Sequence, residues 1–352
     1  MSIKRYIHIG FPKALSTFLQ RNFFDAHPNI FHLGVGCGGN IDYIDPDLEV
    51  AVEDYLLFCK DFRYREKQGF ISETFQHFFS VAESDPHTKA VGISNESLSF
   101  GYIPGHIDVT IKARRMLSIF GKNTSIIMII RNQPALLRSL YRESIRNGYW
   151  GSFNDFMRYI YFFQDRGFLY DFRYDRQHEL YSCLFGKENV HVFELEAFRT
   201  NGLLNENDEG EIELLSRLCG ILNLPYVPLA IERYNDPLSL KELSVKEKLN
   251  RTMIHDLGHS LLSGVLNIHR LRHYFERDLK WIAKDWIYDD VKRKRELIAR
   301  AQKLASKDNV SEISYQYQDE IKERILPFFT EANRALEIRL GKPLLPCYFD
   351  LN

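Results

Sequence analysis

The sequence is short of three features that would fix its class at once: paired cysteines, long apolar runs and an excess of one charge. Its five cysteines are odd in number, widely scattered and without a C-x-x-C pair, which argues against a disulfide framework and a structural zinc site. No run approaches the roughly 18 to 20 apolar residues that a membrane-spanning helix needs. The N-terminal segment lacks the apolar core of a signal peptide. We therefore expect a cytoplasmic protein with reduced, mostly buried thiols.

The charges nearly cancel. The chain has 46 Lys and Arg against 47 Asp and Glu, a formal balance of 46 − 47 = −1. This removes the electrostatic reason to expect a nucleic acid or an anionic membrane as partner. The hydrophobic share of 45% is that of an ordinary globular protein, and nothing in the composition indicates an oligomeric state.

Strand-like and helix-like segments alternate along the first two thirds of the chain. The strongest strand signal is the continuous apolar run over residues 125–130, which is typical of a central parallel strand covered on both faces. Further short strand-like segments are residues 6–9, 90–94 and 190–194. Amphipathic spacing between them predicts helices. The sequence thus predicts an α/β fold, with a P-loop-like three-layer core and a central parallel sheet over residues 1–235 and a helical C-terminal region over residues 236–352.

The loop after the first predicted strand is a candidate anion site. A loop between a buried strand and a helix points unpaired backbone N–H groups and the positive end of the helix dipole at one place. Lys13 adds a full positive charge there, and Ser16 and Thr17 add hydroxyl donors. It is not a Walker A loop, because Pro12 stands where that motif has glycine before the lysine. The alternative is that Ser16 and Thr17 only cap a helix and that Lys13 is solvated.

A second candidate site follows the isoleucine-rich strand at 125–130. Arg131 comes directly after it, where open α/β sheets bind ligands, and a guanidinium binds phosphate with two hydrogen bonds. Ser139 lies two turns along the next predicted helix, where its side chain is expected to reach the same crevice. Taken alone, an arginine at a strand end is equally well explained as a surface ion-pair partner.

Together the two segments resemble the nucleotide-binding signature of sulfotransferases that use 3′-phosphoadenosine 5′-phosphosulfate (PAPS). In that family a P-K-[ST]-G-[ST]-T loop holds the 5′-phosphosulfate, and an R-x(7)-S element holds the 3′-phosphate. Residues 12–17, Pro-Lys-Ala-Leu-Ser-Thr, are similar to the first motif, and Arg131 with Ser139 are similar to the second. Leu15 departs from the pattern, because the family usually has glycine there. A side chain at that place restricts the approach of the backbone to a phosphate.

The resemblance implies a role for each residue of the two motifs. Lys13 would contact the bridging oxygen and the sulfuryl group, and would stabilise the leaving 5′-phosphate. Ser16 and Thr17 would bind the 5′-phosphate, and Arg131 and Ser139 the 3′-phosphate. The cofactor-binding residues implied in this way are Pro12, Lys13, Ala14, Leu15, Ser16, Thr17, Arg131 and Ser139. The cofactor would be PAPS, and the product would be adenosine 3′,5′-bisphosphate.

The reaction also needs a base that takes the proton of the acceptor hydroxyl. Glu96 is the first candidate, because it follows the predicted strand at 90–94, whose carboxyl end should open into the same crevice. His106 is the reserve, and His8 is interpreted as a core histidine. Several carbohydrate sulfotransferases are similar in using a glutamate, so the resemblance favours a saccharide or glycolipid acceptor; a small phenol or alcohol stays open. The alternative role of Glu96 is that of an acid at a helix N-terminus.

The sequence has no convincing metal-binding pattern. No acidic residue stands out as a Walker B carboxylate, which favours sulfuryl transfer without a metal over magnesium-dependent phosphoryl transfer. The pairs His255/His259 and His269/His273 have helical spacing but no third ligand. The glycine-rich segment 34–39 predicts a mobile loop beside the acceptor cleft. Two other functions stay open: a nucleotide-dependent kinase, and a non-catalytic module that binds a nucleotide or a protein partner.

Overall fold

The computed structural model describes residues 3–36, 42–101, 107–164, 169–198, 209–229, 238–251, 295–306 and 310–350. The chain divides into two compact units. The first consists of Met1–Leu136, Gln164–Tyr234 and Pro327–Asn352, and the second of Leu137–Phe163 and Asn235–Leu326. The helices α5 (Gln133–Arg146) and α12 (Asp319–Leu340) contribute residues to both. The predicted domain boundary at residue 235 lies outside the described residues and stays a prediction.

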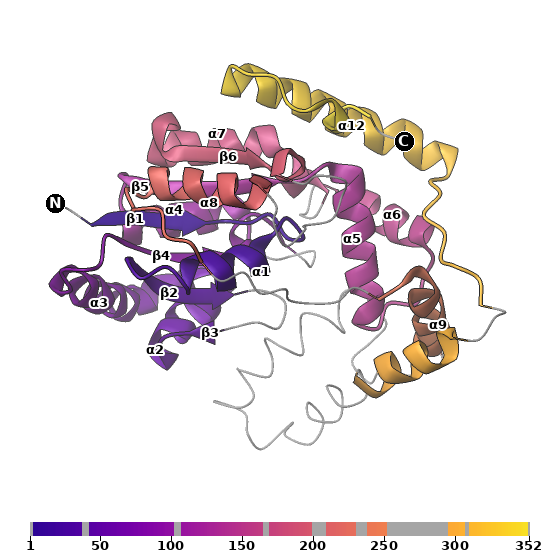
Figure 1. Cartoon of the computed structure of the whole chain (residues 1–352), viewed down its shortest axis with the longest axis horizontal. Coiled ribbons are helices and arrows are strands. Elements are labelled where there is room, and N and C mark those ends of the chain that lie inside the picture. Colours follow the sequence, from indigo (N-terminus) through magenta and orange to yellow (C-terminus); the bar gives the residue numbers. More distant parts are fainter. Residues whose placement is uncertain are drawn as a thin grey trace. The chain divides into compact units, whose positions relative to one another are not determined.

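The first unit is built on one six-stranded sheet (Figure 1). Its strands are β1 (Lys4–His8), β2 (Ile30–Gly36), β3 (Asp42–Tyr43), β4 (Ala90–Asn95), β5 (Thr124–Ile130) and β6 (Val190–Glu194). Their order across the sheet is β3-β2-β4-β1-β5-β6. Every neighbouring pair is parallel except β2 with β3. The predicted central parallel sheet is confirmed.

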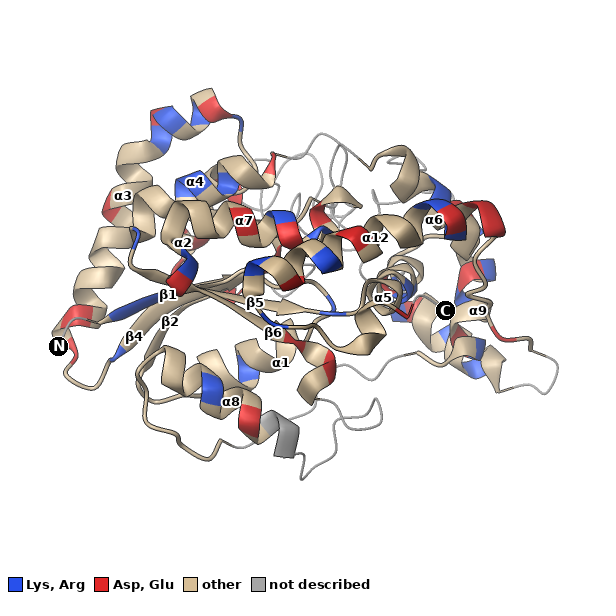
Figure 2. Ribbon diagram, turned by 90° about the horizontal axis from the view of Figure 1, so that it is seen from above, with Lys and Arg blue, Asp and Glu red and all other residues tan. Residues whose placement is uncertain are grey.

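Helices cover both faces of this sheet and make it the middle of three layers. Figure 2 shows α4 and α7 on one side of the strands and α1 and α8 on the other. The helices that lie wholly in this unit are α1 (Ser16–Leu19) continuing as η1 (Gln20–Phe24), α2 (Pro46–Glu49) continuing as η2 (Val50–Leu56), α3 (Asp61–Ser84), α4 (Val109–Phe120), α7 (Tyr174–Phe185) and α8 (Glu209–Ile221). Short 3-10 turns are η3 (Glu96–Leu98), η4 (Tyr170–Phe172), η5 (Lys187–Asn189), η6 (Leu195–Phe198) and η7 (Pro346–Tyr348). The predicted three-layer α/β architecture is therefore confirmed.

The central strands are apolar because both of their faces are covered. All seven residues of β5 are buried, and so are all six of β4. β2 was not predicted, since His32 and two glycines interrupt its apolar run. Gly34, Val35 and Gly36 end this strand, so the prediction of a mobile loop is wrong for these three residues. Residues 37–39 lie outside the described part of the chain.

The second unit contains helices and connecting segments among its described residues. Besides its shares of α5 and α12, it includes α6 (Phe153–Phe162), α9 (Leu240–Arg251) and a helix over residues 295–305. The fully buried Asn250 donates hydrogen bonds to the carbonyls of Ile145 and Tyr149, both at 2.8 Å. α9 and the helix over residues 295–305 agree with the helical character predicted for the C-terminal region.

Two further expectations concern thiols and membrane spans. The cysteines of the described residues are free, but of Cys59, Cys183, Cys219 and Cys347 only Cys219 is buried. The expectation of mostly buried thiols is wrong for this set. No helix in the described ranges combines the length and apolar character that crossing a bilayer requires.

Gly92 of β4 packs directly against β1. A Cβ atom at this position would lie 2.2 Å from the main-chain oxygen of Tyr6, which belongs to β1, a strand paired on both sides. We expect Gly92→Ala to lower the free energy of unfolding by about 2 kcal/mol or more, through overpacking. Urea denaturation measures this change.

Gly69 supplies the matched control for that substitution. It lies exposed inside α3, and an added Cβ would meet nothing within 4 Å. Gly69→Ala should raise the free energy of unfolding by about 0.5–1 kcal/mol, because alanine favours the helix. Equal effects of the two substitutions would contradict the close packing of β4 on β1.

Candidate functional site

Three loops meet at one edge of the sheet. β1 lies between β4 and β5 and runs parallel to both. The lysine loop (residues 10–17) follows β1, Glu96 follows β4 and Arg131 follows β5. Because the carboxyl ends of parallel strands lie on the same edge, all three belong to the region where such sheets bind ligands.

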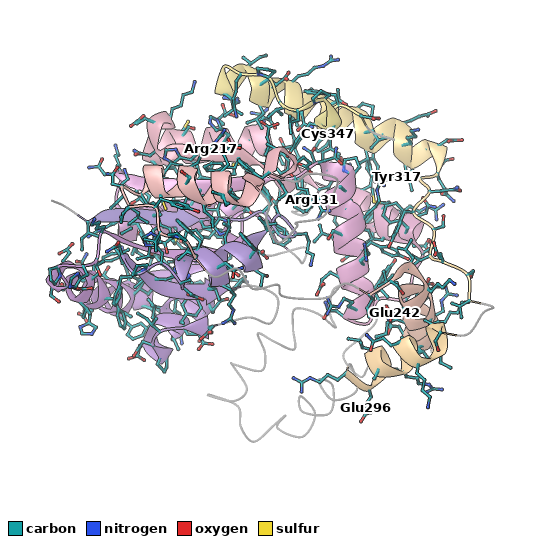
Figure 3. All side chains as sticks on the ribbon, viewed as in Figure 1. Arg131, Arg217, Glu242, Glu296, Tyr317 and Cys347 are labelled. Carbon is teal, nitrogen blue, oxygen red and sulfur yellow. The ribbon has the colours of Figure 1, made fainter. Side chains whose placement is uncertain are left out.

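A hydrogen bond joins two of these loops directly. The guanidinium of Arg131 donates through Nη1 to the main-chain oxygen of Lys13 over 2.8 Å. Arg131, labelled in Figure 3, stands between β5 and α5. The hydroxyl of Tyr174, a buried residue of α7, donates to the main-chain oxygen of Arg131 at 2.6 Å. The arginine is thus bound to the lysine loop by its side chain and fixed through its backbone by a core tyrosine.

The lysine loop has left-handed backbone at two positions. The φ angles of Lys13 and Leu15 are 60° and 69°, in the region that favours glycine. Leu15 is the N-cap of α1 and provides no side-chain cap. Ser16, whose hydroxyl was predicted to bind the 5′-phosphate, is 3% exposed and donates to the main-chain oxygen of Phe11 at 3.0 Å. Thr17 is half-buried in the first turn of α1.

The lysine loop also approaches the segment that carries Glu96. Pro12 and Ala14 are buried, whereas Lys13 is half-buried. Gly10 has a φ of 101°, and a Cβ placed on it would lie 3.4 Å from the Cα of Glu96. Glycine at this position permits both the positive φ and the close approach. The candidate base and the lysine loop are therefore neighbours through their backbones.

Glu96 is the half-buried residue in a run of buried ones, residues 90–100. It begins η3, as the alternative interpretation expected, but the capping hydrogen bond comes from Asn95, whose Oδ1 accepts from the N–H of Ser97 at 2.9 Å. The Asn95 amide also donates to Oε1 of the buried Glu53 at 2.8 Å and to the Tyr43 hydroxyl at 3.0 Å. Asn95 thus fixes the backbone on which Glu96 stands.

Two of the residues that shape this edge were not predicted. Asn95 had a sequence signal, since a polar residue directly after a buried strand lies at the ligand-binding edge of a parallel sheet. Tyr174 had none, because 43 positions separate it from Arg131. Only the packing of α7 on the sheet brings them together.

For Ser139 and five candidate histidines the sequence predictions stay predictions. Ser139 lies half-buried on α5 and belongs to the second unit, whereas Arg131 belongs to the first, so their pairing stays a prediction. Candidate histidines that fall outside the described residues are His106, His255, His259, His269 and His273. Within the described residues no group of three or more His, Cys, Asp and Glu side chains is arranged to hold a metal ion.

His8 is confirmed as a core histidine. Its side chain is fully buried, and a 2.7 Å hydrogen bond joins its Nδ1 to the hydroxyl of Ser94 on β4. Gln20 of η1 donates to the same hydroxyl at 2.9 Å. Burial lowers the pKa of His8 to about 3, so the imidazole is neutral near pH 7. The network ties β1 and β4 to the helix that follows the lysine loop.

Comparison with known proteins gives a likeness in structure alone. No family model matches the chain, and no curated protein matches it. Among solved structures, the chain is similar to the crystal structure of a sulfotransferase from Alicyclobacillus acidocaldarius, with a TM-score of 0.50 and 13% sequence identity over 99% of each chain. At this identity the match shows that the two proteins share a fold.

The left-handed backbone of Leu15 generates a stability prediction. This conformation costs an L-residue about 1–2 kcal/mol, whereas glycine adopts it freely but loses about 0.5–1 kcal/mol more chain entropy on folding. Leu15→Gly and Leu15→Ala both delete the side chain. We expect the glycine variant to be more stable than the alanine variant by about 0.5–1 kcal/mol in urea denaturation. An alanine variant that is equally stable, or more so, would contradict the described loop.

Burial of His8 generates a prediction about pH. Unfolded histidine titrates near 6.5, but the native imidazole titrates at about 3, so the unfolded state binds a proton that the native state does not. Protonation of the unfolded state therefore lowers the free energy of unfolding as the pH falls from 6.5 toward 3, by about 1.4 kcal/mol per pH unit. Above pH 6.5 this loss is absent. His8→Asn, which keeps a hydrogen-bonding group for Ser94, should lose stability less steeply as the pH falls from 6.5. Parallel slopes for both proteins in urea denaturation would refute this.

Proposed function

We propose that the protein is a PAPS-dependent sulfotransferase, which transfers a sulfuryl group to an acceptor hydroxyl. The observation that carries the proposal is the hydrogen bond from Arg131 to the main-chain oxygen of Lys13. It joins the cation proposed for the 3′-phosphate to the loop proposed for the 5′-phosphosulfate. The fold shared with a sulfotransferase supports the same function.

The donors at this edge suit a nucleotide with two anionic ends. Lys13 brings an ammonium, the start of α1 brings backbone N–H groups, and Thr17 brings a hydroxyl in the first turn. Arg131 brings a guanidinium, which matches a phosphate with two hydrogen bonds. The bound nucleotide supplies the sulfuryl group, and the lysine loop and Arg131 hold its opposite ends.

Glu96 and Lys13 divide the chemistry in this proposal. Glu96 takes the proton of the acceptor hydroxyl, and the ammonium of Lys13 neutralises the charge that develops on the leaving 5′-phosphate. The contact of Gly10 with the Glu96 backbone supports this division, because it brings the two loops together. A glutamate base favours a saccharide or glycolipid acceptor, and the transfer is proposed to need no metal.

Two substitutions separate the proposed roles. Lys13→Ala should lower turnover by about a hundredfold or more, because a positioned positive charge is lost where negative charge develops. Arg131→Ala should instead weaken binding of adenosine 3′,5′-bisphosphate about tenfold to a hundredfold, the cost of hydrogen bonds to a charged group. Turnover is measured as the release of adenosine 3′,5′-bisphosphate from PAPS. Binding of adenosine 3′,5′-bisphosphate is measured by calorimetry.

ADP and an exposed arginine serve as controls. Adenosine 3′,5′-bisphosphate should raise the melting temperature of the wild-type protein, and ADP, which lacks the 3′-phosphate, should raise it much less. Arg63→Ala, which removes an exposed arginine of α3, should leave both binding and turnover unchanged. Wild-type turnover in Lys13→Ala, or preferential binding of ADP with magnesium-dependent release of phosphate, would overturn the proposed function.

A further inference from the structure

The segment after β4 has its carbonyl groups bound by side chains instead of a neighbouring strand. Residues 97–101 are buried, and a buried carbonyl without a partner costs about 1–3 kcal/mol. The partners come from α4 and α7: Lys112 Nζ donates to the oxygens of Ser97 (2.7 Å) and Phe100 (3.2 Å), the Tyr181 hydroxyl to Leu98 (3.1 Å), and Gln177 Nε2 to Ser99 (2.7 Å). Each of the four consecutive carbonyls therefore has a donor.

Lys112 contributes most to this arrangement. Its side chain on α4 is 0% exposed, and its ammonium lies 5.7 Å from the ring centroid of Phe58. Burying an ammonium is costly unless hydrogen bonds compensate it, and bonds from a charged donor are stronger than those from a neutral one. By holding two carbonyls three residues apart, the lysine fixes the curvature of the chain between them.

Hydrogen bonds also fix the start of the segment, next to Glu96. The Ser99 hydroxyl donates to the main-chain oxygen of Glu96 at 3.0 Å, and Asn95 caps the turn that Glu96 begins. Gly10 of the lysine loop lies against the Cα of Glu96. Glu96 is therefore the half-buried residue at the start of a buried segment that is held along its length.

We propose that Lys112 is a positioning residue for Glu96, with Tyr181 and Gln177 in support. Lys112 acts through the main chain: it holds the oxygen of Ser97, the residue next to Glu96, and thereby sets the place of the carboxylate relative to the lysine loop. This rests on the proposed function, in which Glu96 is the base. A carboxylate held in this way needs no reorganisation when it takes the acceptor proton.

Lys112→Met tests the proposal, because methionine fills a similar volume and donates no hydrogen bond. We expect turnover to fall about a hundredfold, the order of loss caused by a 1 Å misplacement of a catalytic group. The dissociation constant of adenosine 3′,5′-bisphosphate should stay unchanged, since the lysine loop and Arg131 are untouched. Turnover is measured with PAPS and the best of three acceptors: 4-nitrophenol, methyl β-glucoside and octyl β-glucoside.

A double-mutant cycle separates positioning from general stability. In a Glu96→Gln protein there is no base to position, so adding Lys112→Met should change the remaining turnover by less than about twofold. Thr124→Val is the matched control, because it also removes hydrogen bonds to two main-chain oxygens (Phe120 and Gly121), at the opposite end of β5. It should lower stability and leave turnover per folded molecule unchanged.

The outcomes distinguish this inference from the function on which it rests. If the losses of turnover from Lys112→Met and from Glu96→Gln multiply in the double variant, Lys112 acts independently of Glu96. That result would overturn the positioning role alone. Absence of transfer by the wild-type protein would overturn the proposed function and the positioning role with it. Full turnover in Glu96→Gln would overturn the role of Glu96 as base and the positioning role, and would leave the sulfotransferase function standing. If Lys112→Met does not fold, Tyr181→Phe enters the same cycle. It removes one hydroxyl from the oxygen of Leu98 and should show a smaller loss that also disappears in the Glu96→Gln background.

Discussion

Parallel pairing of β1 with both of its neighbours is the constraint on which the candidate site depends. The two pairings place the ends of β4, β1 and β5 side by side, so the residues that follow these strands have one edge of the sheet in common. Lys13, Glu96 and Arg131 come from widely separated parts of the sequence. A shift of any one strand, or a reversal of its direction, would take its residue away from the other two.

Main-chain atoms hold this edge together. Arg131 binds the oxygen of Lys13, Tyr174 binds the oxygen of Arg131, and Lys112 binds the oxygens beyond Glu96. Hydrogen bonds to these main-chain oxygens fix the positions of the loops. The left-handed backbone at Leu15 has a cost in stability, which the packing around the loop offsets.

The parts of the fold that could be predicted are those whose burial leaves a mark on composition. β5 and β4 are covered on both faces, so they appear in the sequence as continuous apolar runs. β2 is also largely buried, but His32 and its glycines meet specific neighbours and break the run; Gly36, for example, lies where a Cβ would collide with Glu53 and Asn95. The reason for these residues is visible only once their neighbours in the fold are known.

The candidate site likewise contains residues that could be predicted from the sequence and residues that could not. Strand ends and loop composition pointed to Lys13, Glu96 and Arg131, because the ligand-binding edge of a parallel sheet follows from topology. Lys112 carried no signal, since a lysine on an amphipathic helix is normally solvated and nothing local indicates that this one is buried. The Ser16 hydroxyl, whose role toward the 5′-phosphate stays a prediction, donates to the main-chain oxygen of Phe11 within its own loop. Contacts made by tertiary packing are therefore the part that local pattern does not reveal.

A crystal structure of the protein with adenosine 3′,5′-bisphosphate would show whether the lysine loop and Arg131 bind one nucleotide. We expect the 5′-phosphate against residues 10–17 and the 3′-phosphate within hydrogen-bonding distance, about 3 Å, of the Arg131 guanidinium. A nucleotide bound elsewhere on the chain, or one whose 3′-phosphate faces solvent away from Arg131, would contradict this expectation.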